Sequence, residues 1–138
     1  MPDWLLPGPT PAEFPTEERC TITELLNEPA CPEVSLALAR VAPGVTTRLH
    51  AVAGTVERYV VLAGEGIVEV DGETARITPG DRVLVPAGVA QRVAATGPAP
   101  LEFHCVCTPR FRQEDYVDLG DGPAIAPPLT APSPRSPQ

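Results

Sequence analysis

His50 and Glu57 are two side chains that could do chemistry together, and they lie seven residues apart within the stretch Gly44–Gly64. A second polar side chain stands two residues from each: Arg48 before His50, and Tyr59 after Glu57. Residues two apart on a β-strand point to the same face, so each pair would share a side. Burying an imidazole and a carboxylate without partners costs several kcal/mol. An interior that collects them is therefore predicted to be a metal site or an acid–base site.

Two β-rich runs must position these residues. Thr46–Ala51 carries the first pair, Val56–Ala63 carries the second, and a short segment centred on Gly54 joins them. If the two runs pair as a hairpin across Gly54, the guanidinium, the imidazole and the carboxylate converge on one surface. We expect that pairing to build the site.

The rest of the chain repeats this pattern of short apolar runs separated by turn residues. About nine runs follow one another at intervals of roughly eight to twelve residues, which is typical of an all-β sandwich or barrel. A turn or two of helix is predicted only near the end, over Arg112–Leu119. The predicted strands are Arg19–Leu26, Val34–Val41, Thr46–Ala51, Val56–Ala63, Ile67–Asp71, Glu73–Thr78, Asp81–Val85, Val89–Thr96 and Leu101–Thr108.

The two ends of the chain are rich in proline and differ from the middle. We interpret residues 1–18 as an irregular arm, 19–119 as one barrel domain, and 120–138 as a mobile tail without chemistry that could be removed. Several strands are apolar on both faces, and such strands are covered on both sides. This predicts either a homodimer or a monomer covered by its own arm.

Composition excludes some classes of function. The formal net charge of -8 disfavours nucleic-acid binding, because no basic surface is available to neutralise phosphates. Neither a secretory signal nor an apolar run of about 20 residues is visible, so we expect a cytoplasmic protein that is not embedded in a membrane. In that setting the four cysteines are expected to be free thiols. Cys105 and Cys107 would lie about 7 Å apart on one strand face, a poor geometry for a disulfide.

The spacing of the glycines around the candidate site resembles the first motif of the cupin superfamily. That motif reads G-x5-H-x-H-x4-E-x6-G, and Gly44, His50, Glu57 and Gly64 stand at its fixed positions. Val52 occupies the position of the second histidine. The resemblance extends over roughly residues 34–108, and several stretches are similar to uncharacterised bacterial cupin-domain proteins.

The second cupin motif, G-x5-P-x-G-x2-H, is matched by Gly80, Pro86 and Gly88, with Gln91 in place of its histidine. The resemblance implies a conical barrel of antiparallel strands with the site inside. It also implies a metal held by three histidines and one glutamate, of which this chain would supply His50 and Glu57, with Gln91 as a weaker oxygen ligand. We therefore expect one divalent ion, zinc, nickel, manganese or iron, to be bound weakly.

A metal-free pocket is the alternative. There Arg48 would hold an anionic group of the substrate, His50, paired with Glu57, would act as a general acid–base, and Tyr59 would donate to a developing oxyanion. Gln91 would contact the substrate. Cys105 is a further candidate for the pocket, either as a contact or zinc ligand or simply as core filler.

Three functions are compatible with these residues. The favoured one is a non-redox cyclase, isomerase or lyase acting on a small anionic or carbonyl-bearing molecule. A non-haem metal-dependent dioxygenase is the second, although two missing histidines argue against it. The third is a module that binds a small ligand without turning it over, since function belongs to the site and not to the barrel.

Overall fold

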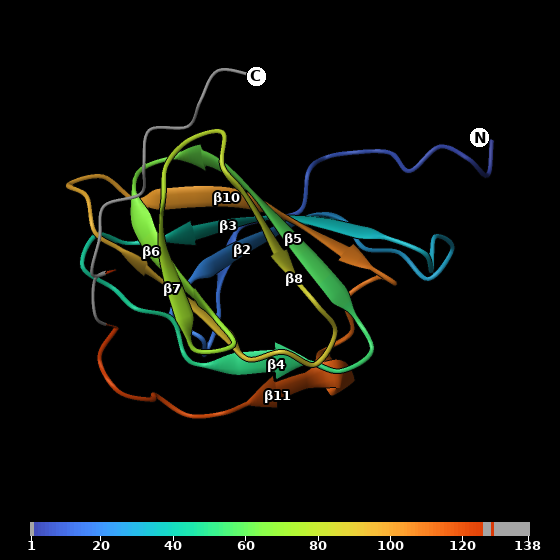
Figure 1. The fold of residues 1–138 in the computed structure, drawn as a ribbon. Coiled ribbons are helices and arrows are strands. Elements are labelled where there is room, and N and C mark those ends of the chain that lie inside the picture. Colours follow the sequence, from blue (N-terminus) through green and yellow to red (C-terminus); the bar gives the residue numbers. More distant parts are fainter. Residues whose placement is uncertain (1, 126–127, 129–138) are drawn as a thin grey trace, which may run out of the picture.

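Two antiparallel sheets face each other in the computed structural model, which describes residues 2–125 and 128. Figure 1 shows the two sheets enclosing a common interior. The larger sheet has six strands in the order β1-β2-β3-β10-β5-β8. Their bounds are β1 Phe14–Pro15, β2 Thr21–Leu26, β3 Ser35–Val41, β10 Leu101–Thr108, β5 Val56–Ala63 and β8 Arg82–Val85.

The smaller sheet has five strands in the order β11-β4-β9-β6-β7. These are β11 Tyr116–Asp118, β4 His50–Val52, β9 Gln91–Ala95, β6 Gly66–Val70 and β7 Glu73–Ile77. All pairings in both sheets are antiparallel, which confirms the predicted all-β class and antiparallel arrangement. Most predicted runs between Val34 and Thr108 match observed strands, and β5 and β10 have the predicted bounds. The run Thr46–Ala51 is the exception, because only His50 and Ala51 of it belong to a strand, β4.

The predicted hairpin across Gly54 is wrong. β4 pairs with β9 and β11 in the smaller sheet, whereas β5 pairs with β10 and β8 in the larger one. The segment between β4 and β5 is a corner that carries the chain from one sheet to the other. His50 and Glu57 therefore belong to opposite walls of the barrel, and they approach across its interior rather than along one surface.

Two short strands were not predicted. β1 lies within the expected irregular arm and pairs with β2, and β11 lies where a helix was expected and pairs with β4. Within residues 2–125 and 128, the helical part is confined to one 3₁₀ turn, Gln113–Asp115. A strand of two or three residues has too little local pattern to be read from sequence, because its pairing partner defines it.

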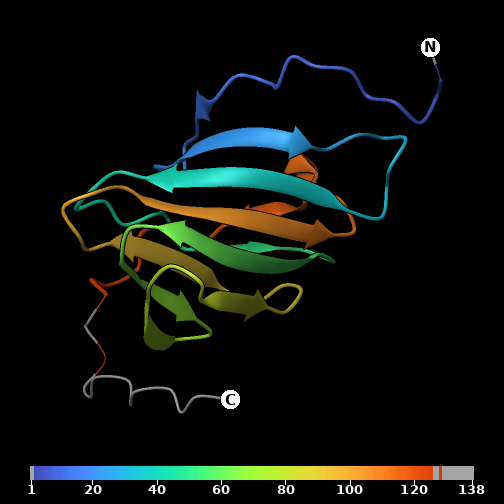
Figure 2. The same cartoon turned by 90° about the horizontal axis from the view of Figure 1, so that it is seen from above.

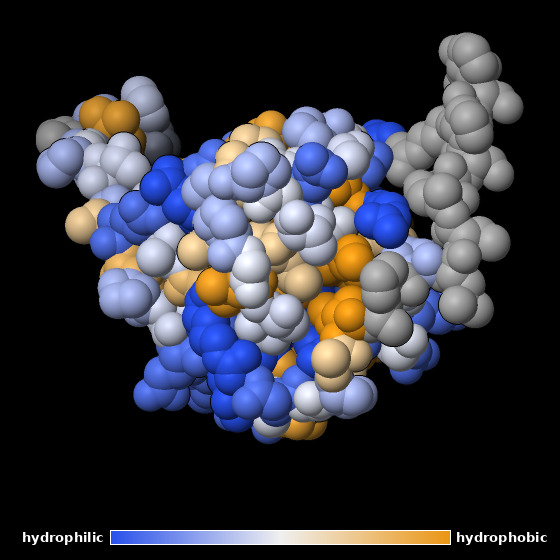
Figure 3. Space-filling model, turned by 90° about the vertical axis from the view of Figure 1, so that its left-hand side faces the viewer, coloured by the Kyte–Doolittle hydropathy of each residue, from blue (hydrophilic) through white to orange (hydrophobic). Residues whose placement is uncertain are grey.

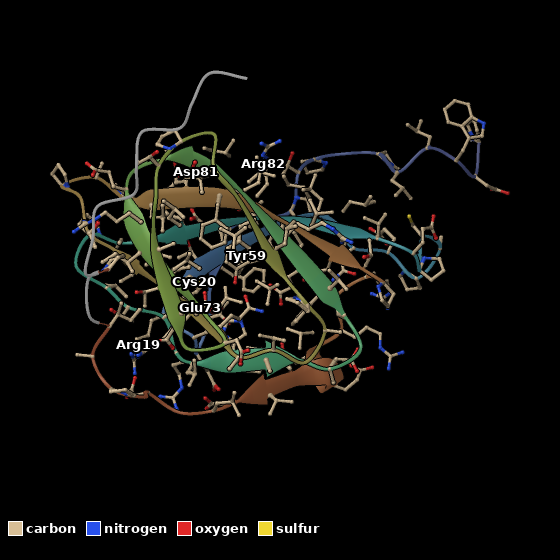
Figure 4. All side chains as sticks on the ribbon, in the orientation of Figure 1. Arg19, Cys20, Tyr59, Glu73, Asp81 and Arg82 are labelled. Carbon is tan, nitrogen blue, oxygen red and sulfur yellow. The ribbon has the colours of Figure 1, made fainter. Side chains whose placement is uncertain are left out.

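The core lies between the sheets, where alternate residues of the strands point inward. Val61, Leu101 and Phe103 are among its buried members, and Tyr59 packs against Phe103 with ring centroids 4.6 Å apart. Figure 4 shows Tyr59 and Cys20 in this interior, whereas Arg19 lies at the edge of the barrel beside the C-terminal segment.

The N-terminal arm before β1 runs along the outside of the larger sheet, beyond β2 (Figure 2). Its apolar side chains are not buried by the described part of the chain, and Trp4 is 83% exposed. On the face shown in Figure 3, hydrophilic side chains are interspersed with small apolar patches. Within the described residues, no helix has the length and hydropathy needed to cross a bilayer.

The start of the predicted tail is held against the barrel. Arg92, on β9, is 3% exposed and donates to the backbone carbonyls of Asp121, at 2.6 Å, and Pro123. Its guanidinium also pairs with Glu69 at 3.2 Å. Residues 120–123 therefore supply hydrogen-bond acceptors to a buried guanidinium, which is a structural role. Residues 126–127 and 129–138 of that predicted tail lie outside the described residues.

Candidate functional site

A cavity of about 500 Å³ opens between the inner faces of the two sheets. Its wall includes residues of both chain ends, because Phe14–Glu18 and the segment from Phe111 to Tyr116 contribute side chains to it. A volume of this size is within the range that holds a small-molecule ligand. The polar lining residues are Thr16, Glu17, Glu18, Glu24, Asn27, Ser35, His50, Glu57, Cys105, Cys107, Gln113 and Tyr116.

His50 begins β4 and is 5% exposed. Its Nδ1 lies 3.0 Å from the backbone carbonyl oxygen of Arg48 and 3.6 Å from a carboxylate oxygen of Glu18. The ring stacks on Tyr116 of β11, with centroids 5.2 Å apart. Because a carbonyl can only accept, Nδ1 carries the proton, and in the neutral ring Nε2 is left as the basic nitrogen. The imidazole is thus fixed in tautomer and in orientation.

Glu57 lies on β5, on the opposite wall, and is 5% exposed. Burial raises the pKa of its carboxyl, because the interior disfavours the charged form, and the charge of His50 opposes that shift. The thiol of Cys105 donates to Oε2 of Glu57 at 3.3 Å. The raised pKa makes Glu57 a group that can hold a proton within the cavity.

Gln91 begins β9 and stands directly opposite His50 in the strand register. It is 1% exposed, and its Oε1 has no hydrogen-bond partner among the described residues. A buried amide oxygen without a partner is uncommon, because leaving it unpaired costs about 1–3 kcal/mol. Gln91 is not part of the cavity lining itself, but it lies beside the site, because its side chain acts on Glu57 and lowers the pKa of that carboxyl by hydrogen bonding.

Cys105 and Cys107 both line the cavity from β10. Their sulfur atoms lie 3.8 Å apart, and both thiols are free. The hydrogen bond between the two sulfur atoms and then burial raise the pKa of the Cys105 thiol well above its ordinary range. The structure thus places Cys105 in the cavity wall, together with Cys107, which was not among the candidate site residues.

Two predicted site residues are placed elsewhere. The guanidinium of Arg48 pairs with Asp118 of β11 at 3.0 Å and is not among the cavity-lining residues. Tyr59 shares the inward face of β5 with Glu57, but its ring is buried against Phe103 in the core and also lies outside the lining. Burial raises the pKa of Tyr59 well above its ordinary range, so its hydroxyl stays protonated. Neither residue lines the cavity in this structure.

The charge of the cavity wall was not foreseen from the sequence. Among the described residues, four carboxyl groups line it, those of Glu17, Glu18, Glu24 and Glu57, and no lysine or arginine does. Burial, followed by the charge of Glu18, raises the pKa of Tyr116. Glu17 and Glu18 belong to the arm, where no motif marks them. Cys107 could have been found, because it stands two residues from Cys105 on the same strand.

The metal set implied by the motif resemblance does not fit this site. Of its four positions, only His50 supplies an imidazole and only Glu57 a carboxylate, while Val52 is apolar and buried. Gln91 offers the unpaired amide oxygen described above. Among the described residues, the single group of three His, Cys, Asp or Glu side chains with ligand atoms within 4.8 Å of one another is Glu57, Cys105 and Cys107, which contains no histidine.

Comparison with known proteins places this chain in a family. Residues 37–107 match the family model described as "Cupin domain". An uncharacterized protein of Methanocaldococcus jannaschii is 31% identical over 102 residues, covering 72% of this chain and 82% of that protein. An oxalate-binding protein of Thermotoga maritima is 33% identical over 70 residues, covering 51% of this chain and 58% of that protein.

A solved structure agrees with these matches. The crystal structure of a predicted oxalate decarboxylase from Thermotoga maritima is 27% identical, covers 72% of this chain and 91% of its own, and superposes with a TM-score of 0.64. The two facing antiparallel sheets, the matched family model and this structural likeness agree with one another. The chain belongs to the cupin family and has its jelly-roll barrel fold.

Proposed function

We propose that this cupin binds a small molecule in the barrel cavity and acts on it by non-redox acid–base chemistry, as a lyase, isomerase or cyclase. The observation that carries the proposal is the contact of His50 Nδ1 with the Arg48 carbonyl oxygen at 3.0 Å, from which the tautomer follows, while the side chain lines the cavity. A general base needs this arrangement, because its free nitrogen must be held within reach of the proton it removes.

Glu57 complements His50 from the opposite wall. Its raised pKa favours the protonated carboxyl, so it can donate a proton to a leaving group or to a developing oxyanion. His50 would remove a proton on one side of the ligand while Glu57 returns one on the other. Arg48 and Tyr59 line no part of the cavity, so this proposal assigns the chemistry to His50 and Glu57 alone.

The wall favours a ligand that is uncharged or positively charged. In the part of the chain that the structure describes, four carboxyl groups line the cavity, and the basic side chain that lines it is His50. An anionic group would meet this negative field without a guanidinium to pair with. Of the two ligand classes expected from the sequence, the carbonyl-bearing one is therefore supported better than the anionic one.

Binding without turnover is the second candidate function. It is favoured by the relative named as an oxalate-binding protein, which is 33% identical over 70 residues. A small dianion could enter this acidic cavity only together with a cation that bridges it to the wall. The two candidates therefore predict different ligands: an uncharged carbonyl or hydroxyl compound in the first, and a dicarboxylate with a divalent ion in the second.

Ligand screening by thermal shift tests the two candidates directly. The protein would be melted with a panel of uncharged carbonyl and polyhydroxyl metabolites, and with oxalate in the presence and absence of zinc. Compounds that raise Tm would then be followed by NMR for conversion. We expect stabilisation by an uncharged compound and its conversion by the wild type.

Matched variants of the two histidines make the test specific. His50→Gln should abolish conversion, whereas His104→Gln, on β10 outside the cavity lining, should leave it unchanged. Stabilisation by oxalate and zinc alone, with no conversion of any compound, would favour the binding module. Conversion that survives His50→Gln would remove the acid–base proposal.

A homodimer and a cytoplasmic location are also proposed. Leu62 on β5, Leu84 on β8 and Trp4 in the arm are large apolar side chains exposed on the single chain, and a second copy would cover them. The four free cysteines support a reducing compartment. Light scattering coupled to size-exclusion chromatography measures the mass, and a Leu84→Glu variant that remains monomeric while wild type is dimeric would locate the interface.

A further inference from the structure

We propose that Cys105, Cys107 and Glu57 form a binding site for a thiophilic divalent ion, with zinc as the natural fit. This site shares only Glu57 with the ligand set that the family motif describes. The proposal concerns an ion-binding equilibrium, so it holds or fails whether or not the cavity turns a substrate over.

Strand geometry places the three side chains together. Cys105 and Cys107 are two apart on β10, so they point to the same face. Cys107 stands directly opposite Glu57 of β5 in the strand register. Directly opposed residues have their Cβ atoms about 4.5–5.5 Å apart. The three ligands therefore sit on neighbouring positions of one rigid sheet face, which holds them better than loops would.

The distances between the ligand atoms match a tetrahedral zinc site. Two thiolates bound at about 2.3 Å with a tetrahedral angle between them lie roughly 3.8 Å apart. The sulfur atoms of Cys105 and Cys107 are 3.8 Å apart. A thiolate and a carboxylate oxygen on the same ion lie roughly 3.5 Å apart, and the Cys105 sulfur is 3.3 Å from Oε2 of Glu57. All three ligand atoms fall within 4.8 Å of one another. Little movement is needed to accept an ion.

The cavity supplies access and a fourth position. Glu57, Cys105 and Cys107 all line it, so an ion can enter from the open space rather than through the core. Three protein ligands leave one tetrahedral position for water or a ligand group, which is the arrangement of catalytic rather than structural zinc sites. The carboxyl groups of Glu17, Glu18 and Glu24 in the same wall make the cavity attractive to cations.

The ligand types select the ion. Two thiolates favour zinc or another thiophilic metal over magnesium, calcium or manganese, which prefer oxygen. Binding requires that the two thiols lose their protons, so it is accompanied by proton release and weakens as pH falls. Zinc binding also takes Glu57 as a carboxylate, and so removes the proton that the acid–base proposal assigns to it. Metal loading and acid–base turnover should therefore oppose each other.

Cobalt titration tests the site in the intact chain. Reduced protein freed of metal with a chelator would be titrated with Co²⁺ and followed by absorption. We expect a thiolate-to-cobalt charge-transfer band that saturates at one equivalent and disappears when zinc is added. Cys105→Ser and Cys107→Ser should each abolish the band and weaken zinc binding at least about 100-fold.

Two further variants discriminate between sites. Cys31→Ser removes a thiol outside the cavity lining and should leave the band and the affinity unchanged. His50→Gln should also leave them unchanged, because the proposed site contains no imidazole. If His50→Gln abolishes ion binding while the Cys105 and Cys107 variants retain it, the ion occupies the motif-derived set and the proposal is overturned. Wild-type protein that binds neither ion overturns it as well.

A measurement on the wild type covers the case in which a cysteine variant fails to fold. Alkylation of the native protein, read by mass spectrometry, reports each thiol separately. Zinc should protect Cys105 and Cys107 against alkylation and leave the rate at Cys31 unchanged. Equal rates with and without zinc at both cavity thiols would contradict the proposal. The conversion assays for His50 run separately, so a failure here leaves the acid–base proposal standing, and the reverse is also true.

Discussion

The paired strands β5 and β10 have two ends that differ in chemistry. At one end, Val61 faces Phe103 and the side chains are apolar and closely packed. At the other end, Glu57 faces Cys107, and the side chains are titratable and open onto a cavity. The backbone register is continuous between them, so one ladder of hydrogen bonds supports both regions.

The difference separates stability from chemistry. The closed end gains stability by burying apolar surface, roughly 25 cal/mol per Å². At the cavity end, a buried carboxyl and the unpaired amide oxygen of Gln91 lower the stability of the fold. It is completed by residues 14–18 and by the segment from Phe111 to Tyr116, whereas the closed end is covered by the barrel strands themselves. Substitutions should therefore have unequal effects at the two ends.

The largest effect is expected at a glycine of the closed end. Gly64 follows β5 with φ of +80°, and a Cβ there would lie 2.3 Å from the carbonyl oxygen of Pro100 and 2.8 Å from Cα of Leu101. Both obstacles are backbone, so Gly64→Ala should prevent normal folding or lower Tm drastically. Gly44 is the matched control: its φ is +79°, but a Cβ would meet nothing within 4 Å. Circular dichroism melting should show Gly44→Ala to be milder; equal losses would mean that crowding at Gly64 is unimportant.

A cavity-forming substitution compares the two ends of the ladder. Phe103→Ala removes a buried ring packed against Tyr59 and should cost about 3–5 kcal/mol in the free energy of unfolding. Cys107→Ala, at the cavity end of the same strand, should cost about 1 kcal/mol, because its side chain is smaller and already borders open space. Urea denaturation measures both. If Cys107→Ala lowers the free energy of unfolding more than Phe103→Ala does, the cavity end contributes more to stability than the closed end.

Truncation tests how residues 120–123 support the smaller sheet. Cutting after Leu119 removes the carbonyl of Gly120, which accepts from the Leu49 amide at 2.9 Å, and the carbonyls of Asp121 and Pro123 that accept from buried Arg92. We expect a loss of about 1–3 kcal/mol in the free energy of unfolding. Cutting after Ala124 retains those carbonyls and should have a smaller effect. If Tm is unchanged when the chain is cut after Leu119, residues 120–138 are dispensable for the fold.

The smallest effect is a gain of stability that depends on pH. The pKa of Glu57 is raised in the folded protein. The protonated carboxyl therefore adds to the free energy of unfolding in full at pH values below the ordinary carboxyl range, and this stabilisation is lost as pH rises through the folded pKa. Glutamine cannot lose a proton at that position. The Tm of Glu57→Gln relative to wild type should therefore rise between pH 5 and pH 8. A difference that stays constant, or falls with pH, would mean that Glu57 is a stabilised carboxylate.

Sequence reasoning succeeded where a pattern extends over many residues. The paired motifs and the regular strand spacing predicted the fold, and alternation along β5 correctly placed Glu57 and Tyr59 on the inward face. Alternation failed at Arg48, because the strand begins only at His50 and the two-residue rule does not apply before it. Glu18 and β11 were missed for a related reason, since tertiary pairing rather than local sequence sets their positions.

The position of β10 has a consequence for biosynthesis. β3 and β5 are not paired with each other, and β10 lies between them although it is made about forty residues after β5 ends. During translation, the edges of β3 and β5 that pair with β10 remain unpaired until residues 101–108 have left the ribosome. Such late insertion of a central strand slows folding and exposes strand edges that can pair with other chains. Expression at low temperature or with chaperones that shield nascent β-edges should therefore improve the yield of this protein.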